Sequence, residues 1–254
     1  MATPLHEFRP TTRFSDRADD YVKFRPTYPA AALDAVLMGL GPPGMLVVAD
    51  VGAGTGISSR LLAERGCRVI AIEPNGAMRA AAEPHPGVEW RDGSAEATGL
   101  KEASVDLVVC AQAFHWFRPG EALAEFARVL RPGGRLALLW NLRDETDGLT
   151  GEYGAAVRRA ATDGAVDKDL QADWLFRTPP FGGARLARLT GEAQVLTEQG
   201  LIGRALSSSY VPREGPGLER LIAELRTMHG RHAGPDGQVR FPYVTEVYLA
   251  DRAG

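Results

Sequence analysis

The segment around residue 50 has the composition of a small-molecule binding turn. Glycine recurs at every second position in Asp50-Val51-Gly52-Ala53-Gly54-Thr55-Gly56. An apolar run precedes these residues and a helical pattern follows them, so the chain must turn tightly where a ligand can approach its backbone. The unpaired N–H groups at the start of the helix then attract a carboxylate or a phosphate. We predict that this turn binds part of a nucleoside-type ligand.

An acidic residue stands at the end of the next apolar run. Glu73 follows residues 68–72 and comes 21 residues after Gly52. A carboxylate at this distance from a glycine-rich turn can accept hydrogen bonds from both hydroxyls of a ribose. Nicotinamide-dependent enzymes use the same position, so Glu73 indicates a nucleoside without identifying it.

The spacing of the glycines separates two candidate ligands. A dinucleotide site has the pattern Gly-x-Gly-x-x-Gly and needs a small residue at position 57. This chain has Ile57 there and no Tyr-x-x-x-Lys pair, which argues against a nicotinamide-dependent oxidoreductase. The observed Gly-x-Gly-x-Gly, with Asp50 two residues before it, resembles motif I of the class I S-adenosylmethionine-dependent methyltransferases.

Two further segments fit this resemblance. In the methyltransferase family a loop at the position of Gly93-Ser94-Ala95-Glu96 lines the adenine, and many members carry an acid where this chain has Ser94. Here the acid is Glu96, which leaves the partner of the adenine amino group open. The apolar run 105–111 ends where the mouth of the site is expected. Its last residue begins the string Ala111-Gln112-Ala113-Phe114-His115-Trp116-Phe117.

The candidate catalytic residues are His115, Tyr21 and Trp116. His115 is the candidate base because the pKa of histidine lies near neutrality, and a base is needed only if the acceptor arrives protonated. The alternative is that His115 only packs or bonds to the backbone. Trp116 either contacts a sulfonium by cation–π attraction or fills the core.

The elements that must hold these residues follow a regular order. Residues 45–51, 68–72, 87–90, 105–111 and 135–140 have the pattern of strands, and helical patterns alternate with them. Continuous apolar strands are typical of parallel sheets covered on both faces. The alternation predicts an α/β, doubly wound, mostly parallel sheet that binds ligands at the carboxyl ends of its strands. We expect a seven-stranded Rossmann-like sheet with an antiparallel edge strand and a helical cap.

We expect one domain, residues 1–254, made of four parts. Residues 1–40 form N-terminal lid helices and residues 45–141 form the cofactor-binding core. Residues 142–235 form a helical cap and late elements, in which 142–185 are expected to be helices and loops. Apolar residues alternate with polar ones over 238–249, which predicts a final, half-exposed strand at or near an edge of the sheet.

Residues 45–141 together resemble the small-molecule methyltransferases of the methyltransferase 11 type. The N-terminal sequence 21–29 and the string 112–117 are similar to the trans-aconitate methyltransferase-like subgroup. The resemblance implies S-adenosylmethionine as methyl donor, S-adenosylhomocysteine as product and a small-molecule acceptor, for which an oxygen of a carboxylate or hydroxyl is expected. Nitrogen, carbon and sulfur acceptors stay open. The implied cofactor contacts are Tyr21, Arg25, Asp50, Gly52, Ala53, Gly54, Thr55, Gly56, Glu73, Pro74, Met78, Ser94, Ala95, Glu96, Ala111 and Gln112.

Charge and composition argue against several partners. The net charge is −3, and the chain lacks the Asn-Pro-Pro-aromatic and Pro-Cys motifs of nucleic-acid methyltransferases, so no nucleic acid is expected. No run approaches the roughly 18–20 apolar residues of a membrane span and no signal peptide is evident, which favours the cytoplasm. His229 and His232 lack a third ligand, so no metal is expected. A protein that binds the cofactor without catalysis remains the alternative, and the oligomeric state is left open.

Overall fold

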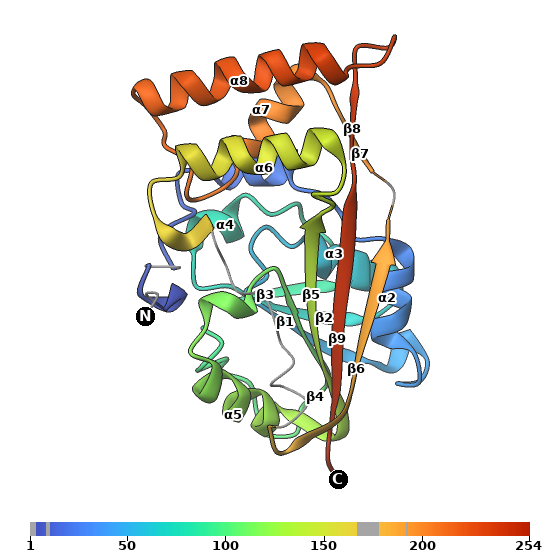
Figure 1. The fold of residues 1–254 in the computed structure, drawn as a ribbon. Coiled ribbons are helices and arrows are strands. Elements are labelled where there is room, and N and C mark those ends of the chain that lie inside the picture. The colour runs from blue at the N-terminus through green and yellow to red at the C-terminus, as the bar shows by residue number, and fades with distance from the viewer. Residues whose placement is uncertain (1–3, 9–10, 167–177, 192) are drawn as a thin grey trace.

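A seven-stranded sheet runs through the protein (Figure 1). The computed structural model describes residues 4–8, 11–166, 178–191 and 193–254. The order of the strands is β3-β2-β1-β4-β5-β9-β6, and β9 runs antiparallel to both of its neighbours while the other pairings are parallel. The predicted fold class is therefore confirmed. The strands are β1 (Val47–Val51), β2 (Arg68–Ile72), β3 (Val88–Arg91), β4 (Val105–Ala111), β5 (Leu130–Arg143), β6 (Phe181–Thr190) and β9 (Tyr243–Arg252).

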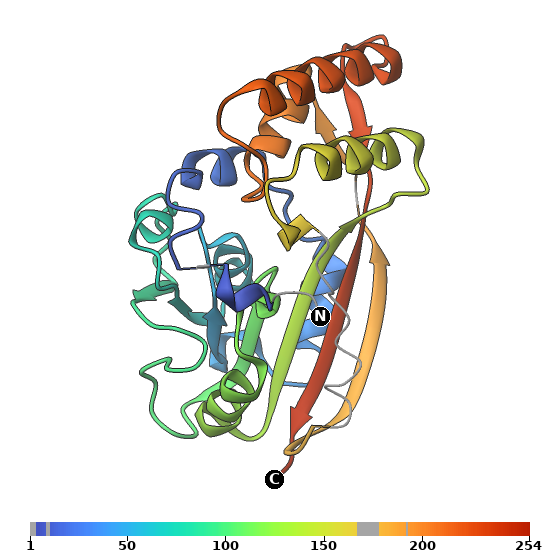
Figure 2. The ribbon, with the colours of Figure 1, turned by 60° about the vertical axis from the view of Figure 1, so that its left-hand side comes forward.

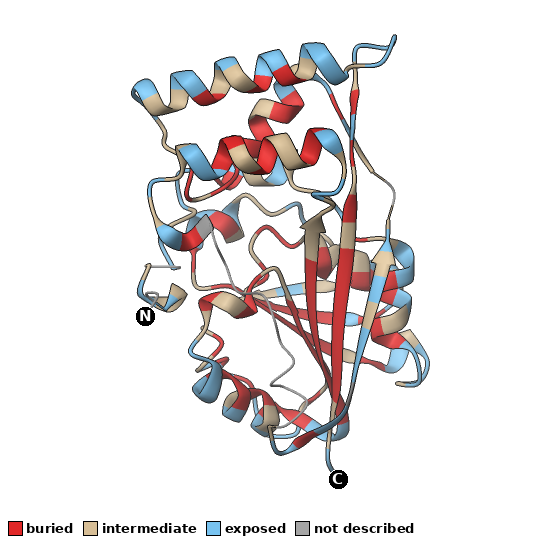
Figure 3. Ribbon diagram, in the orientation of Figure 1, coloured by how far each residue is buried: buried red, intermediate tan, exposed pale blue. Residues whose placement is uncertain are grey.

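Helices cover both faces of this sheet. On one face α2 (Ala30–Leu37) and α3 (Ile57–Glu64) pack against alternate strand residues such as Val48. On the other face α5 (Pro119–Val129) buries Phe126 against residues that include Ala49, the neighbour of Val48. Since successive residues of β1 enter opposite layers, the strand must be apolar on both sides. Figure 3 shows the resulting buried band along the central strands.

The end of the chain differs from the expected half-exposed strand over 238–249. β8 (Val239–Phe241) pairs with β7 (Gln194–Leu196) in a separate ladder, and most of β9 is buried between β5 and β6. Thr245 and Glu246 are buried although they are polar, because Thr245 donates to Asn141 Oδ1 at 2.6 Å and Glu246 accepts from Tyr248 at 3.1 Å. The edge strand beside β9 is β6, part of which lies in the range expected to be helices and loops.

A cap stands over the carboxyl ends of the parallel strands (Figures 1 and 2). It contains α6 (Gly148–Ala160), α7 (Glu198–Leu206), α8 (Pro216–His232) and the β7-β8 ladder, which share one apolar cluster. Near the amino terminus, α1 (Ala18–Phe24) packs against α7. The other short elements are η1 (Leu5–Glu7), η2 (Pro43–Met45), α4 (Gly76–Ala80), η3 (Phe114–Trp116) and η4 (Gly164–Val166). Within the described ranges no helix has the length and apolar character needed to cross a membrane.

Candidate active site

The glycine-rich turn joins β1 to α3 where the order of the strands reverses. The sheet extends from β1 to β2 and β3 on one side and to β4 and β5 on the other, and ligands of such sheets bind at this switch point. Gly52 and Gly56 have φ angles of 71° and 78°. A Cβ on Gly52 would lie 2.6 Å from Ala113 Cβ, and one on Gly56 would lie 2.8 Å from the Trp90 ring. Both positions therefore require glycine.

Asp50 stabilises this turn through its side chain. The carboxylate is fully buried, and its Oδ2 accepts hydrogen bonds from the hydroxyls of Ser58 at 2.7 Å and Ser59 at 2.6 Å. Burial raises the pKa of Asp50, and the two serine hydroxyls oppose that shift. Asp50 thereby fastens the end of β1 to the first turn of α3, but it does not line the neighbouring cavity.

Glu73 lies at the carboxyl end of β2 with both oxygens against the backbone. Its Oε2 accepts from the N–H of Gly54 at 2.9 Å, and its Oε1 accepts from the N–H of Asn75 at 2.8 Å. Burial raises the pKa of Glu73, while these two hydrogen bonds and Arg79 oppose that shift. Each oxygen has a second lone pair, so the carboxylate can still accept two hydroxyl groups.

A cavity of about 620 Å³ opens beside Glu73 and the glycine-rich turn, a size common for small-molecule sites. Twelve of the residues expected at the site line it: Tyr21, Gly52, Gly54, Glu73, Pro74, Met78, Ser94, Ala95, Glu96, Ala111, Gln112 and Trp116. Six expected residues do not line it: Arg25, Asp50, Ala53, Thr55, Gly56 and His115. Seven other residues line the cavity that were not among the expected contacts, although Ala113 and Phe117 belong to the string expected at its mouth: His6, Thr11, Thr12, Phe14, Ala113, Phe117 and Arg118.

Gln112 marks the floor of the cavity at the end of β4. Its φ angle is 58°, an uncommon value for a residue with a side chain. Its Nε2 donates to the carbonyl of Asn141 at 3.0 Å, and its backbone N–H donates to Leu139 at 2.8 Å. These bonds to β5 hold the strained residue in place, and strain of this kind clusters at functional sites.

His115 differs from the expectation that it faces the reacting groups. It lies on η3, and its Nδ1 accepts a hydrogen bond from the indole N–H of Trp140 at 3.2 Å. This bond occupies the Nδ1 lone pair and sets the tautomer that carries its proton on Nε2. A base needs a free lone pair within reach of the substrate. His115 does not line the cavity, whereas Trp116 does.

The acid expected near the adenine has a structural partner. Glu96 lines the cavity, but its Oε1 accepts from the N–H of Arg118, the residue that precedes α5, at 2.9 Å. Glu96 therefore has a partner within the protein, just before the start of α5, independently of any ligand. Ser94 lies nearby and pairs with Ala97 in an isolated bridge.

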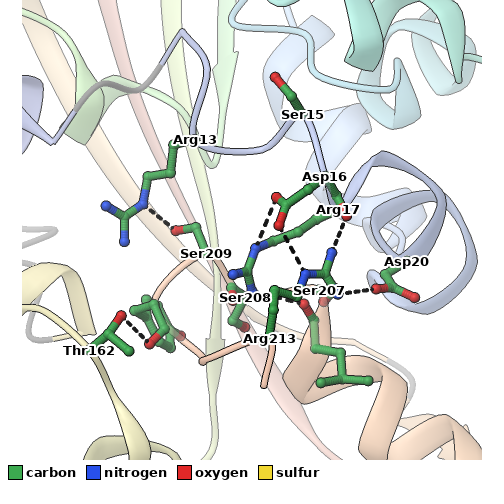
Figure 4. Close-up of polar contacts among 12 residues, drawn as sticks. Arg13, Ser15, Asp16, Arg17, Asp20, Thr162, Ser207, Ser208, Ser209 and Arg213 are labelled. Atoms are coloured by element: carbon green, nitrogen blue, oxygen red, sulfur yellow. Dashed lines mark hydrogen bonds and ion pairs between the residues drawn. The ribbon is translucent and has the colours of Figure 1, made fainter. Parts of the chain in front are cut away.

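The N-terminal segment closes one side of the cavity through Phe14 and Tyr21. Ser15 receives a hydrogen bond of 3.0 Å from Asn75, the N-cap of α4, which ties the segment to the loop that carries Glu73. Figure 4 shows its other attachment, to the cap. Arg17 donates to the Ser208 carbonyl at 2.5 Å in this attachment. In addition, Arg13 donates to Ser209, and Arg213 pairs with Asp16 and Asp20.

The comparisons with known proteins agree with this geometry. The profile of the methyltransferase domain family Methyltransf_11 matches residues 49–138. The uncharacterized methyltransferase Rv3342 of Mycobacterium tuberculosis is 37% identical over 241 residues, which cover 91% of this chain and 92% of that protein. The uncharacterized methyltransferase-like protein C25B8.10 of Schizosaccharomyces pombe is 39% identical over 135 residues, covering 52% and 53% of the two chains.

Solved structures of methyltransferases have the same fold. A protein of Anaeromyxobacter dehalogenans assigned to the type II methyltransferases matches with a TM-score of 0.59 and 25% identity over 90% of this chain and 98% of its own. Phosphoethanolamine N-methyltransferase 2 of Haemonchus contortus, solved with S-adenosyl-L-methionine, matches with a TM-score of 0.56 and 14% identity over 100% of this chain and 61% of its own. At that identity the second match shows the fold alone.

A doubly wound sheet with a glycine-rich turn at its switch point is the architecture of the class I S-adenosylmethionine-dependent methyltransferases. This chain belongs to the methyltransferase family. It is an enzyme that uses S-adenosylmethionine and acts on a small molecule.

Proposed function

We propose that the cavity holds S-adenosylmethionine and that the chain transfers its methyl group to an oxygen of a small-molecule acceptor. The observation that carries the cofactor assignment is Glu73, whose buried carboxylate lies against the Gly54 and Asn75 N–H groups. Both of its oxygens can accept a ribose hydroxyl. The bound cofactor supplies an activated methyl group on a sulfonium.

The other expected cofactor residues divide by position. Those that line the cavity contact the cofactor directly, with Pro74 and Met78 packing near the adenine and Ser94, Ala95 and Glu96 at its edge. Asp50, Ala53, Thr55 and Gly56 shape the turn from behind it. Tyr21 closes the cavity from the N-terminal segment, and Arg25 stacks on the outer side of that ring, 4.6 Å from its centroid.

The four parts of the chain then have distinct roles within one domain. Residues 1–40 form the lid, 45–141 hold the cofactor and 142–235 cover the acceptor. In place of the single strand expected over 238–249, β8 and β9 connect the cap to the sheet. Methyl transfer is an in-line displacement whose leaving group is neutral, so the enzyme needs no acid and contributes mainly alignment and exclusion of water. The hydrogen bonds from Asn75 to Ser15 and from Arg17 to Ser208 hold the lid over the cavity.

An oxygen acceptor that is already ionised fits these residues best. A carboxylate needs no base, and His115, the expected base, is placed off the cavity. The similarity of residues 21–29 and 112–117 to the trans-aconitate methyltransferase-like subgroup supports the same acceptor.

Two measurements test this proposal. Thermal unfolding with S-adenosylmethionine, S-adenosylhomocysteine or NAD should give a rise of several degrees with the first two only, because a ligand at 100 times its dissociation constant adds about 2.7 kcal/mol. A methyl-labelled donor is then offered carboxylic acids, phenols, amines and thiols. Base-labile label in the carboxylic-acid products supports the proposal, and label confined to amines or thiols would overturn it.

A further inference from the structure

Three arginines come together where the cap meets the carboxyl end of the sheet. Arg143 is the last residue of β5 and lies opposite Tyr243 in the ladder with β9. Arg204, on α7, donates from Nε to the Tyr243 hydroxyl at 2.9 Å. Arg25, which follows α1, donates to the carbonyl of Ser207 at 2.9 Å, while Arg204 donates to the hydroxyl of Ser207 at 3.4 Å. Segments far apart in the sequence therefore build one basic cluster.

This cluster holds more positive than negative charge. Among the residues that the structure describes, Arg25 and Arg204 form no ion pair within 4.0 Å. Arg143 pairs with Glu145 at 3.3 Å, and Glu145 is shared with Arg158. Burial and the neighbouring charge of Arg204 both lower the pKa of Arg25. Buried charge without a counter-ion is unfavourable, so a bound anion would stabilise the folded chain.

The same cluster contains hydrogen-bond donors that the described residues leave unpaired. They are Nε of Arg25, Nε of Arg143 and the hydroxyl of Tyr153. Tyr153, on α6, is 1% exposed, and the Arg143 guanidinium lies 5.7 Å from its ring centroid. Buried polar groups are nearly always paired in native proteins. Unpaired donors beside surplus positive charge are the features that a small anion would satisfy.

The cluster also lies next to the proposed site of methyl transfer. The Arg25 guanidinium stacks 4.6 Å from the centroid of the Tyr21 ring, and Tyr21 lines the cavity. The Tyr21 ring and Arg25 therefore lie between the cavity and Arg204, and Arg143, Arg204 and Tyr153 do not line the cavity itself. An acceptor bound in the cavity reaches the cluster only if these two side chains move aside.

We propose that Arg143, Arg204 and Tyr153 form a subsite for an anionic group of the acceptor, distinct from the oxygen that receives the methyl group. The acceptor is then a small organic anion anchored through a carboxylate or a phosphate, both of which match the planar fork of arginine. Arg25 lies between this subsite and the cavity. The inference rests on the proposed function, because it names the substrate class of the same site.

The test titrates succinate and inorganic phosphate against the wild-type protein, with and without S-adenosylhomocysteine, and uses succinamide at matched ionic strength as the uncharged control. We expect saturable binding of succinate or phosphate and none of succinamide. The anion that binds identifies the group. Arg204→Gln and Tyr153→Phe should each weaken this binding about tenfold or more, because each removes a donor to a charged group.

Tyr153→Phe also separates binding from structure. It removes a hydroxyl that the described residues leave unpaired, so the melting temperature of the variant should be unchanged or higher while anion binding falls. Tyr248→Phe is the matched control, because its buried hydroxyl bonds to Glu246 at 3.1 Å and its loss should lower stability without changing anion binding. Arg226→Gln, on the exposed side of α8, removes the same charge as Arg204→Gln and should leave anion binding unchanged.

Three results would overturn the subsite: no anion binds better than succinamide, Tyr153→Phe binds anions as the wild type does, or Arg226→Gln weakens binding as much as Arg204→Gln. The rise in melting temperature with S-adenosylhomocysteine gives a separate readout. If that shift is present and anions fail to bind, the subsite is refuted and the proposed function stands. If that shift is absent, the proposed function fails. The anion titrations made without S-adenosylhomocysteine then still decide whether the cluster binds anions.

Discussion

Replacing Glu73 with glutamine changes one charge while keeping the shape of the side chain. The carboxylate accepts two backbone hydrogen bonds, 2.9 Å from Gly54 and 2.8 Å from Asn75. Glutamine has one acceptor oxygen, so its NH₂ group must face one of these N–H groups and can no longer accept a ribose hydroxyl. Losing one hydrogen bond to a charged group costs about 1.5–3 kcal/mol. The dissociation constant of S-adenosylhomocysteine should therefore rise about 10- to 150-fold.

The pH dependence provides a second check on Glu73. Burial raises the pKa of Glu73 in the folded chain. At pH values between the unfolded and the folded pKa, the folded state therefore binds more protons than the unfolded state does. This group's contribution to the free energy of unfolding accordingly falls as pH rises through that interval. Ligand hydroxyls donate to the ionised form, so ligand affinity should increase over the same interval. The glutamine variant should not show this dependence.

Calorimetric titration of S-adenosylhomocysteine from acidic to neutral pH measures the loss of affinity in the glutamine variant and the pH dependence of affinity in the wild type. In thermal unfolding, a tenfold weaker affinity removes about 1.4 kcal/mol of ligand stabilisation, or about 3–5 °C. Glu89→Gln, an exposed carboxylate on the adjacent strand β3, is the matched control and should leave affinity unchanged. Wild-type affinity and pH slope in the Glu73 variant would refute the role of this carboxylate.

Three further substitutions test the turn, the lid and the expected base. Gly52→Ala places a Cβ 2.6 Å from Ala113 Cβ, so the free energy of unfolding in urea should fall by about 1–3 kcal/mol, and an unchanged value would contradict the close approach. Gly203→Ala places a Cβ in steric conflict with the Phe24 ring of α1. This should displace α1 and speed dissociation of S-adenosylhomocysteine in stopped-flow experiments, whereas an unchanged rate would remove the lid from cofactor retention. His115→Gln should lower the free energy of unfolding by about 1 kcal/mol, because the variant loses the hydrogen bond to the Trp140 indole. Turnover should stay within about threefold of the wild type. A hundredfold loss of turnover would instead support His115 as a base.

Local signals were sufficient for the core of this fold. The apolar run 105–111 is β4 with the same bounds, because a strand covered on both faces must be apolar along its whole length. Gly52 and Gly56 have positive φ angles because the turn leaves no room for a side chain. Asn75 caps α4 and accepts hydrogen bonds from the N–H groups of Ala77 and Met78, which follow it in the sequence. Each of these features depends on neighbours that are close in the sequence, or on a general rule of burial.

Features that depend on distant partners required the folded chain. The alternation of apolar and polar residues over 238–249 predicted a half-exposed strand, yet the polar residues Thr245 and Glu246 are buried by partners on β5, β6 and β9 itself. Bonding to Trp140, 25 residues away, decides the placement of His115.

The same distinction holds at the proposed sites. The sequence alone predicts where the parallel strands run, where the glycine-rich turn lies and which acid lies beside that turn, because those depend on period, sterics and spacing. Arg25, Arg143 and Arg204 carry no local motif, and their convergence follows only from the way β5, α7 and the N-terminal segment pack together. The charge of that cluster follows from the tertiary structure, since burial and the pairing of Arg143 alone with a carboxylate are properties of the folded chain, as far as the structure describes it.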